Sequence, residues 1–332
     1  AMNGGAMMGG EMNGGAMVGG APGGMWVGGD DRGGDLIPVM NDQDQDRVND
    51  EDDNCPNDYN PEQSDIDGDG EGDACEPDRD LDGVPDAWDP APDDVNWPGR
   101  AQADTVYAHT SSELYALDVK RLTLNFVSRF SFDDQLNHQM TDIAFDRSGV
   151  MWAVSFDALW VCHPMTGQCR YQGTLPSRFN GLTFLSGTLF GALRDVLVGI
   201  SVDGTWHRLN VANGVINSSE IGSYPIETSS GDAFYIDGVG TYAAVKRPGI
   251  EDDLIINVDP LNLGVVNDIV ILNGYQRIYG LAGWRGQLFA FDESGAVLLV
   301  NLQTMDVSVI SDDGQMWWGA GVSSILYSIP SN

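Results

Sequence analysis

Three acidic stretches between Asp42 and Asp89 carry carboxylates with one repeated spacing. In each stretch, acidic residues stand at positions 1, 3, 5, 9 and 12, and the main-chain carbonyl of position 7 offers a further oxygen. The three sets are Asp42, Asp44, Asp46, Val48, Asp50 and Asp53; Asp65, Asp67, Asp69, Glu71, Asp73 and Glu76; and Asp78, Asp80, Asp82, Val84, Asp86 and Asp89. Alternating carboxylates on a tight loop bring many hard oxygens to one point, which suits Ca²⁺. We therefore predict about three bound Ca²⁺ ions, and more where neighbouring loops share their oxygens.

The same region holds most of the negative charge of the chain. Residues 30–94 contain 25 acidic residues and three basic ones, which gives −22 of the net charge of −34. Without cations such a segment repels itself and stays expanded, so a solvated, disordered linker is the alternative interpretation. The threefold repeat of the ligand spacing favours calcium binding over that linker. The strong negative charge also argues against partners such as nucleic acids or anionic lipids.

Prolines next to the loops exclude a helix–loop–helix calcium hand. Pro77 and Pro90 directly follow the second and third loops, and Pro56 follows the first loop by three residues. Proline at these places prevents an exit helix from starting normally. We therefore expect the loops to wind around their ions with little regular structure.

The segment 42–89 resembles the thrombospondin type-3 repeat. The resemblance includes the Asp-Asn-Cys-Pro motif at Asp53–Pro56 and the Asn-Pro-x-Gln step at Asn60–Gln63. It implies a calcium-loaded spacer, of a kind that occurs beside many unrelated domains, and it therefore leaves the function of the whole chain open. It also implies a disulfide between Cys55 and Cys75. The first loop departs from the family, because Arg47 stands at the sixth position, where the other two loops have glycine.

Cysteine usage points to the cell exterior. The four cysteines form two local pairs, Cys55 with Cys75 and Cys162 with Cys169, a pattern typical of disulfides rather than of a four-thiolate zinc site. Disulfides and a calcium-dependent segment fit an oxidising, extracellular or cell-surface location. No apolar run is long enough to span a bilayer, and no signal peptide opens the chain. We therefore interpret Ala1 as the start of a mature, exported protein whose signal peptide has been removed.

Three regions follow from composition: a low-complexity arm at 1–35, the acidic segment at 36–99 and a β-rich domain at 100–332. The arm contains glycine pairs about every five residues, with methionines in phase. So many glycines do not fold alone, because ordering each residue costs about 1–2 kcal/mol. We expect the arm to contact its own domain or a neighbouring subunit, with self-assembly through the arm as the favoured outcome; a flexible tether is the alternative. A methionine copper(I) site is disfavoured, since the arm has no histidine or cysteine.

The region 100–332 is predicted to be all-β. Short apolar strands are separated by turn signals such as Thr166-Gly167 and Ser294-Gly295. A loose repeat opens at Thr141, Asn180, Gly231, Ile278 and Gly319, in steps of 39, 51, 47 and 41 residues. This is the size of a four-stranded propeller blade. We predict a five-bladed β-propeller whose last blade is completed by residues 105–130; a β-sandwich or a six-bladed ring is the alternative.

No catalytic constellation is evident. The histidines His109, His138, His163 and His207 lack metal-ligand spacing, and no nucleophile elbow, phosphate loop or redox motif occurs. Acids lie near predicted strand ends, where they are turn formers or, in propeller enzymes, members of a channel site; they are Asp146, Asp237, Asp259 and Asp292. We expect no enzyme, with a glycosidase-like or lyase-like site as the alternative.

The tryptophans of the β-rich region are expected to fill the space between blades, although they would also suit a sugar-binding face. They are Trp152, Trp160, Trp206, Trp284, Trp317 and Trp318. Taken together, the features predict a calcium-binding structural or adhesive protein, a subunit of an extracellular fibre or surface assembly that associates through its arm. The alternative is a cell-surface module whose propeller binds a carbohydrate or protein ligand.

Overall fold

The computed structural model describes residues 41–212, 214–312 and 314–323, so the arm predicted at 1–35 lies outside the described residues. The chain divides into two compact units, residues 1–63 and residues 64–332. The boundary falls within the acidic segment expected at 36–99. The first acidic loop thus belongs to one unit, and the second and third loops belong to the unit that contains the β-domain.

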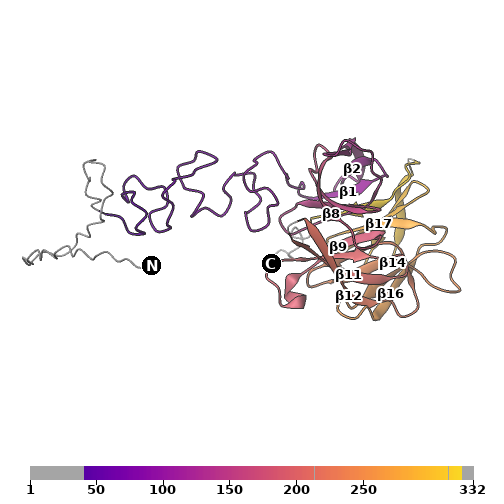
Figure 1. The fold of residues 1–332 in the computed structure, drawn as a ribbon. Helices are drawn as coiled ribbons and strands as arrows, with labels where there is room; N and C mark the ends of the chain where they lie inside the picture. The colour runs from indigo at the N-terminus through magenta and orange to yellow at the C-terminus, as the bar shows by residue number, and fades with distance from the viewer. Residues whose placement is uncertain (1–40, 213, 313, 324–332) are drawn as a thin grey trace, which may run out of the picture. The chain divides into compact units, whose positions relative to one another are not determined.

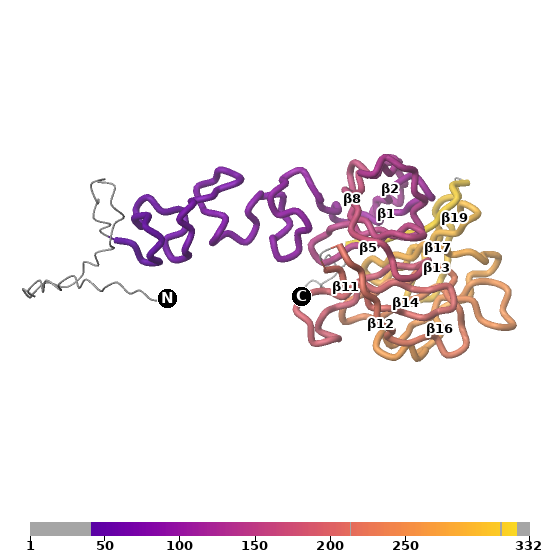
Figure 2. The backbone as a smooth tube through the Cα atoms, viewed as in Figure 1, coloured from indigo at the N-terminus to yellow at the C-terminus, as the bar shows by residue number. Residues whose placement is uncertain are grey.

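Residues 41–99 contain turns and bends but no strand or helix, as the irregular trace in Figures 1 and 2 shows. This agrees with the expectation from the flanking prolines. No helix among the described residues has the length and apolar character needed to cross a bilayer.

The β-domain is a five-bladed β-propeller, as predicted, and most of its sheets have four antiparallel strands. The first two blades, from the inner to the outer strand, are β21 (Gly319–Gly321), β1 (Thr105–His109), β2 (Glu113–Asp118) and β3 (Thr123–Arg129); and β5 (Met140–Phe145), β6 (Met151–Ser155), β7 (Ala158–Cys162) and β8 (Gln168–Thr174). A short strand, β4 (Ser131–Phe132), extends the second blade by pairing in parallel with β8.

The remaining three blades follow in chain order. They are β9 (Gly181–Leu185), β10 (Val196–Ile200), β11 (Thr205–Ala212) and β12 (Val215–Ser223); β13 (Thr228–Ile236), β14 (Gly240–Lys246), β15 (Leu254–Val258) and β16 (Val265–Ile271); and β17 (Ile278–Trp284), β18 (Gln287–Asp292), β19 (Ala296–Asn301) and β20 (Val307–Asp312). A 3-10 helix, η1 (Gly187–Phe190), lies between β9 and β10.

The ring closes in the first blade, which combines both ends of the domain. Strand β21 pairs antiparallel with β1, and His109 lies opposite Gly319. The blade is therefore completed by residues from before the second blade, as the sequence repeat predicts. The innermost strands β21, β5, β9, β13 and β17 neighbour one another around the axis. This arrangement puts the five repeat openings of the sequence side by side.

Aromatic side chains fill the space between blades. Trp160, Trp206 and Trp317 are fully buried. Trp317 packs edge-on against Tyr115 of the first blade and Phe291 of the fifth, with ring centroids 5.2 Å and 5.6 Å apart. Such contacts agree with the interpretation of these tryptophans as interblade core.

Candidate calcium sites

The three acidic loops adopt one backbone conformation. In each loop the residues at positions 4 and 6 have positive φ, a region that costs an L-residue about 1–2 kcal/mol. The φ angles are 67°, 77° and 51° at Gln45, Gly68 and Leu81, and 83°, 99° and 90° at Arg47, Gly70 and Gly83. The first loop therefore makes the same sharp turn as the others, although Arg47 replaces the glycine there.

The first carboxylate of each loop organises the turn. Its second oxygen accepts a hydrogen bond from the main-chain N–H of position 6, which holds the loop in a tight curl. The three bonds run from Arg47 to Asp42 (3.1 Å), from Gly70 to Asp65 (3.2 Å) and from Gly83 to Asp78 (3.1 Å). This curl positions the carboxylates at positions 1, 3 and 5 on one side of the loop.

The carboxylate at position 9 closes the loop. It accepts a hydrogen bond from the N–H of position 2, in the pairs Gln43 with Asp50 (2.9 Å), Ile66 with Asp73 (2.9 Å) and Arg79 with Asp86 (3.1 Å). In the third loop, the Arg79 side chain also forms an ion pair with Asp86 at 2.8 Å. A carboxylate that already accepts these hydrogen bonds is placed to contact the cation through a water molecule. The acid at position 9 of calcium loops often acts in this way.

Oxygens from positions 1, 3 and 5 converge in every loop. In each triplet, one carboxylate oxygen per residue lies within 4.8 Å of the others. The triplets are Asp42, Asp44 and Asp46; Asp65, Asp67 and Asp69; and Asp78, Asp80 and Asp82. Exposed acidic groups can also gather without an ion, so the decisive observation is how these oxygens are satisfied.

Positions 3 and 12 present a buried carboxylate oxygen without a hydrogen-bond partner in all three loops. They are Asp44 and Asp53, Asp67 and Glu76, and Asp80 and Asp89. In the third loop, Asp78 and Asp82 add an unpartnered oxygen each. Burying a charged oxygen without a partner is costly, and a hard cation that takes six to eight oxygens removes that cost. The donor set therefore fits Ca²⁺. The carbonyls of Val48, Glu71 and Val84 remain predicted ligands at position 7.

The same crowding changes the acidity of the predicted ligands. Desolvation, followed by neighbouring carboxylates, raises the pKa of Glu76 to about 7. Desolvation likewise raises the pKa of Asp82 to about 6 and that of Asp89 to about 7, and nearby acids add to both shifts. A proton and a cation thus compete for these oxygens.

The third loop packs onto the second blade. Val84, at position 7 of the loop, is 0% exposed and shares a hydrophobic cluster with Trp97, and with Val150 and Val161 of the blade. From the sequence, Val84 was predicted only as a carbonyl ligand at position 7 of the loop. Its side chain was missed as a contact, because a single valine within an acidic loop gives no periodic signal.

Polar contacts surround this cluster. The Arg100 guanidinium donates to the carbonyl of Ser148 at 2.9 Å, and the Ala101 N–H donates to that of Gly149 at 2.8 Å. The guanidinium of Arg147 lies over the ring of Trp88 at 5.2 Å from its centroid. The third loop and the residues that directly follow it are therefore held to the second blade by both apolar and polar contacts.

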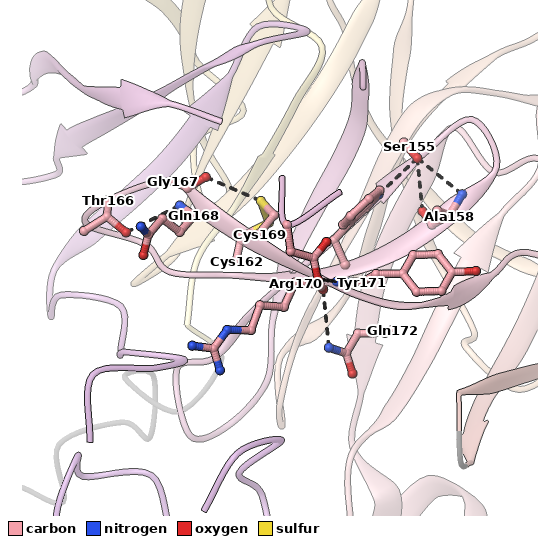
Figure 3. The surroundings of a disulfide bond; sticks show 12 residues. Ser155, Ala158, Cys162, Thr166, Gly167, Gln168, Cys169, Arg170, Tyr171 and Gln172 are labelled. Carbon is pink, nitrogen blue, oxygen red and sulfur yellow. Dashed lines mark hydrogen bonds between the residues drawn. A yellow bond between two sulfur atoms is a disulfide. The ribbon is translucent and has the colours of Figure 1, made fainter. Parts of the chain in front are cut away.

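Disulfide bonding agrees with the paired cysteines of the sequence. Cys162 and Cys169 face each other on β7 and β8 and are bonded. Figure 3 shows this disulfide next to Arg170. Cys55 and Cys75 are also disulfide-bonded, and the described part of the chain contains no free cysteine.

Asp146, Asp259, Asp292 and His163 accept main-chain hydrogen bonds from nearby residues. Asp146 accepts hydrogen bonds from the N–H groups of Ser148 and Val150 at 2.9 Å and 3.1 Å. In the same way, Asp259 and Asp292 accept from the N–H two residues later. Asp237 accepts from the hydroxyl of Tyr235, and His163 from the N–H of Met165 within its hairpin. These contacts occupy the acids locally and do not assemble them into one site.

One comparison with known proteins concerns the acidic loops. A family model of the thrombospondin type 3 repeat matches residues 64–96, which include the second and third loops. Repeats of this kind indicate a calcium-binding, extracellular protein. No curated protein matches the chain.

Solved structures also match the chain. The crystal structure of a nidogen/laminin complex has a TM-score of 0.43 and 8% identity, and the match covers 66% of this chain and 98% of that one. A protein of unknown function from Bacteroides caccae has a TM-score of 0.38 at 10% identity, covering 62% and 72%. BamB from Moraxella catarrhalis has a TM-score of 0.30 at 13% identity, covering 63% and 59%.

Proposed function

We propose that this chain is a non-enzymatic, extracellular structural or adhesive protein in which calcium fixes the acidic connector to the propeller. The observation that carries the proposal is the double role of Val84. Its carbonyl is the predicted position-7 ligand of the third loop, and its side chain is buried in the cluster with Val150 and Val161. An ion that fixes this loop therefore also fixes the apolar contact to the second blade.

Electrostatic repulsion within the third loop determines how calcium affects the contact between Val84 and the second blade. Without calcium, the carboxylates of the loop repel one another and several of their oxygens stay buried without a partner. Opening the loop relieves both costs, but it withdraws Val84 from the propeller surface. Metal binding is then part of the folding of this region.

A direct test is hydrogen exchange of the full chain with saturating calcium and after chelation. We expect the amides around Val84 and Trp97 to lose protection without calcium, together with the β6–β7 surface of the second blade. Exchange at amides of the fourth and fifth blades should stay unchanged and serves as the internal control. Equal protection of the Val84 region in both conditions would refute calcium-dependent docking.

The finer proposal is that the chain is a subunit of a fibre or surface assembly, with the arm at 1–35 joining one subunit to the next. Its support is the composition of the arm, which is rich in glycine and methionine and nearly free of charge up to residue 29. Extended segments of this kind associate by main-chain pairing with exposed strand edges. Calcium would then hold the propellers at a constant spacing along the assembly.

Electron microscopy of the purified full chain and of a chain lacking residues 1–35 tests this. Filaments or sheets that need both the arm and calcium support the assembly. Dispersed particles of the full chain in calcium would reject it. In that case, a glycan array and a search for protein ligands with the full chain would examine the alternative, a surface-binding propeller tethered by its arm.

A further inference from the structure

The turn between the two inner strands of the third blade is longer than its counterparts. Residues 186–195 separate β9 from β10, whereas the corresponding turns of the second, fourth and fifth blades comprise residues 146–150, 237–239 and 285–286. The longer turn lies within the longest step of the sequence repeat, which has 51 residues. An insertion in one repeat often belongs to a binding face. We name residues 186–195 the blade-3 insertion.

The blade-3 insertion is folded tightly on itself. A Cβ at Gly187 would lie 2.0 Å from the carbonyl oxygen of Arg194 and 2.6 Å from that of Ala192, so this position requires glycine. The Ala192 N–H donates to the carbonyl of Gly187 at 2.8 Å. Leu189 and Phe190 pack against the hydrophobic cluster between the third and fourth blades. The insertion therefore presents Arg194 at a defined place on the propeller.

Trp88 of the third acidic loop lies at this place. It occupies position 11 of the loop, directly before Asp89. The guanidinium carbon of Arg194 lies 5.7 Å from the centroid of the Trp88 ring, and that of Arg147 lies 5.2 Å from it. A guanidinium over an indole ring at such a distance is attracted to it. Because Arg147 follows β5 of the second blade, Trp88 contacts two neighbouring blades.

An ion pair joins the two turns that carry these arginines. Nε of Arg147 donates to Oδ2 of Asp195 at 3.0 Å, and Nη2 of the same guanidinium pairs with Oδ1. The Asp195 side chain is 6% exposed, so this bidentate pair is largely shielded from water. Asp195 also offsets the positive charge that Arg147 and Arg194 bring together. Trp88 thus lies against a pair of turns that are already bound to each other.

The position of the Trp88 ring depends on a predicted calcium ligand. Asp89, at position 12, has Oδ2 buried without a hydrogen-bond partner, while its Oδ1 accepts the N–H of Ala91 at 2.7 Å. The N–H groups of Trp88 and Asp89 both donate to the carbonyl of Pro85, at 2.7 Å and 3.0 Å. The two residues therefore belong to one turn. An ion that fixes the Asp89 carboxylate also fixes the main chain that carries the Trp88 ring.

We propose that Trp88 forms a calcium-dependent contact that fixes the orientation of the third loop on two blades. With an ion in the loop, the Trp88 ring stays against Arg147 and Arg194; after chelation it leaves them. This inference rests on the proposed function and adds the regulation of loop orientation to it. The Val84 cluster lies on the second blade alone, so the loop can still turn about that contact. A second contact, at the blade-3 insertion, prevents such a turn.

Electrostatic attraction between the loop and the propeller opposes this calcium dependence. The third loop carries five carboxylates, and without calcium their negative charge attracts Arg147 and Arg194 more strongly. If that attraction outweighed the repulsion within the loop, Trp88 would stay in place without the ion. The state of the Trp88 ring before and after chelation therefore decides between the two effects.

Fluorine NMR of the full chain labelled with 5-fluorotryptophan measures this state. The chain has nine tryptophans, and the variants Trp88→Phe and Trp97→Phe assign the two resonances that are needed. We expect chelation to shift the Trp88 resonance and to increase its solvent isotope shift between H₂O and D₂O, since the half-buried ring becomes exposed. The Trp97 resonance reports the Val84 cluster in the same spectrum.

Two arginine variants test the contact itself in saturating calcium. Arg194→Gln should move the Trp88 resonance towards its calcium-free position. The matched control is Arg178→Gln, because the Arg178 guanidinium also lies 5.7 Å from a ring centroid, but over Phe156. The control should leave the Trp88 resonance unchanged. Unchanged resonances of the tryptophans in the fourth and fifth blades show that each variant is folded.

The Trp88 and Trp97 resonances separate the failure of this inference from that of the proposed function. A Trp97 resonance that responds to chelation beside a Trp88 resonance that does not would overturn the inference and leave the docking of Val84 intact. A response of Trp88 alone would support the inference and reject calcium-dependent docking of the Val84 cluster. If neither resonance responds, both ideas are wrong. A Trp88 resonance that is the same in Arg194→Gln and wild type would also overturn the inference.

Discussion

The guanidinium of Arg170 forms an ion pair with the carboxylate of Asp94, with 2.7 Å between Nη2 and Oδ2. The same guanidinium lies 4.3 Å from the ring centroid of Trp97. Arg170 stands on β8, directly after Cys169, whose disulfide with Cys162 links β8 to β7. A cross-linked outer strand therefore contacts the end of the acidic segment. Because the ion pair is partly exposed, its own contribution is small. Its main effect is to orient the segment over the cluster around Val84.

Truncating Val84 tests this cluster. Val84→Ala removes two buried methyl groups, so we expect the free energy of unfolding in calcium to fall by about 2 kcal/mol. The matched control is Val95→Ala, since Val95 belongs to the same segment but is 56% exposed. Its effect should stay within about 0.5 kcal/mol. Denaturant unfolding in calcium measures both, and equal effects of the two variants would contradict the buried contact.

Replacing Arg47 by glycine should strengthen the first loop. Arg47 has a φ of 83° at the position where the other loops have glycine. Arg47→Gly removes backbone strain of about 1 kcal/mol, which corresponds to an approximately fivefold gain in calcium affinity of this loop. Calorimetry of calcium binding measures the gain. Glu51→Gly, a change at an exposed residue of the same loop, is the control and should not raise the affinity. Unchanged or weaker binding by Arg47→Gly would show that the arginine conformation carries no strain.

Calcium binding should release protons. In the calcium-free protein, desolvation raises the pKa of Glu76 and Asp89 to about 7 and that of Asp82 to about 6. These groups are protonated below those values, and calcium must displace the protons. The affinity is therefore expected to be highest above about pH 7 and to fall as the pH falls through 7 and 6. Titrations in buffers of different ionisation enthalpy count the released protons. An affinity that is constant between about pH 5 and 8 would contradict the prediction.

The parts of this protein that sequence predicts are those encoded over short distances. A calcium loop needs ligands within twelve residues, so the spacing from Asp78 to Asp89 specifies it completely. The blade repeat was also recognisable, because each innermost strand begins with the same small or polar residues before an apolar run. In the structure two of those residues lie close together, since a Cβ at Gly319 would lie 2.3 Å from Oδ1 of Asp142.

Contacts between distant segments were not predictable in this way. The burial of Val84 against Val150 and Val161 joins residues more than sixty positions apart, and one valine among acids carries no pattern. At Arg47 the sequence predicted a difference that the structure does not have. Arginine replaces the glycine of the family pattern there, but the loop keeps the backbone conformation of the other two loops.

Positions 9 and 12 of the loops should differ sharply in their importance for calcium. Glu76 carries a buried oxygen without a partner, whereas Asp73 uses one oxygen to accept the N–H of Ile66 at 2.9 Å and the other to accept the hydroxyl of Ser64. Glu76→Gln removes one charge from the ion itself, and we expect at least about a tenfold loss of calcium affinity in the second loop. Asp73→Asn removes the same charge but retains an oxygen that can close the loop. We expect a loss of about threefold, in keeping with a ligand that acts through water. Calorimetry of the two variants beside wild type makes the comparison. A greater loss in Asp73→Asn than in Glu76→Gln would show that position 9 contacts the ion directly and that the loop-closing hydrogen bond is secondary.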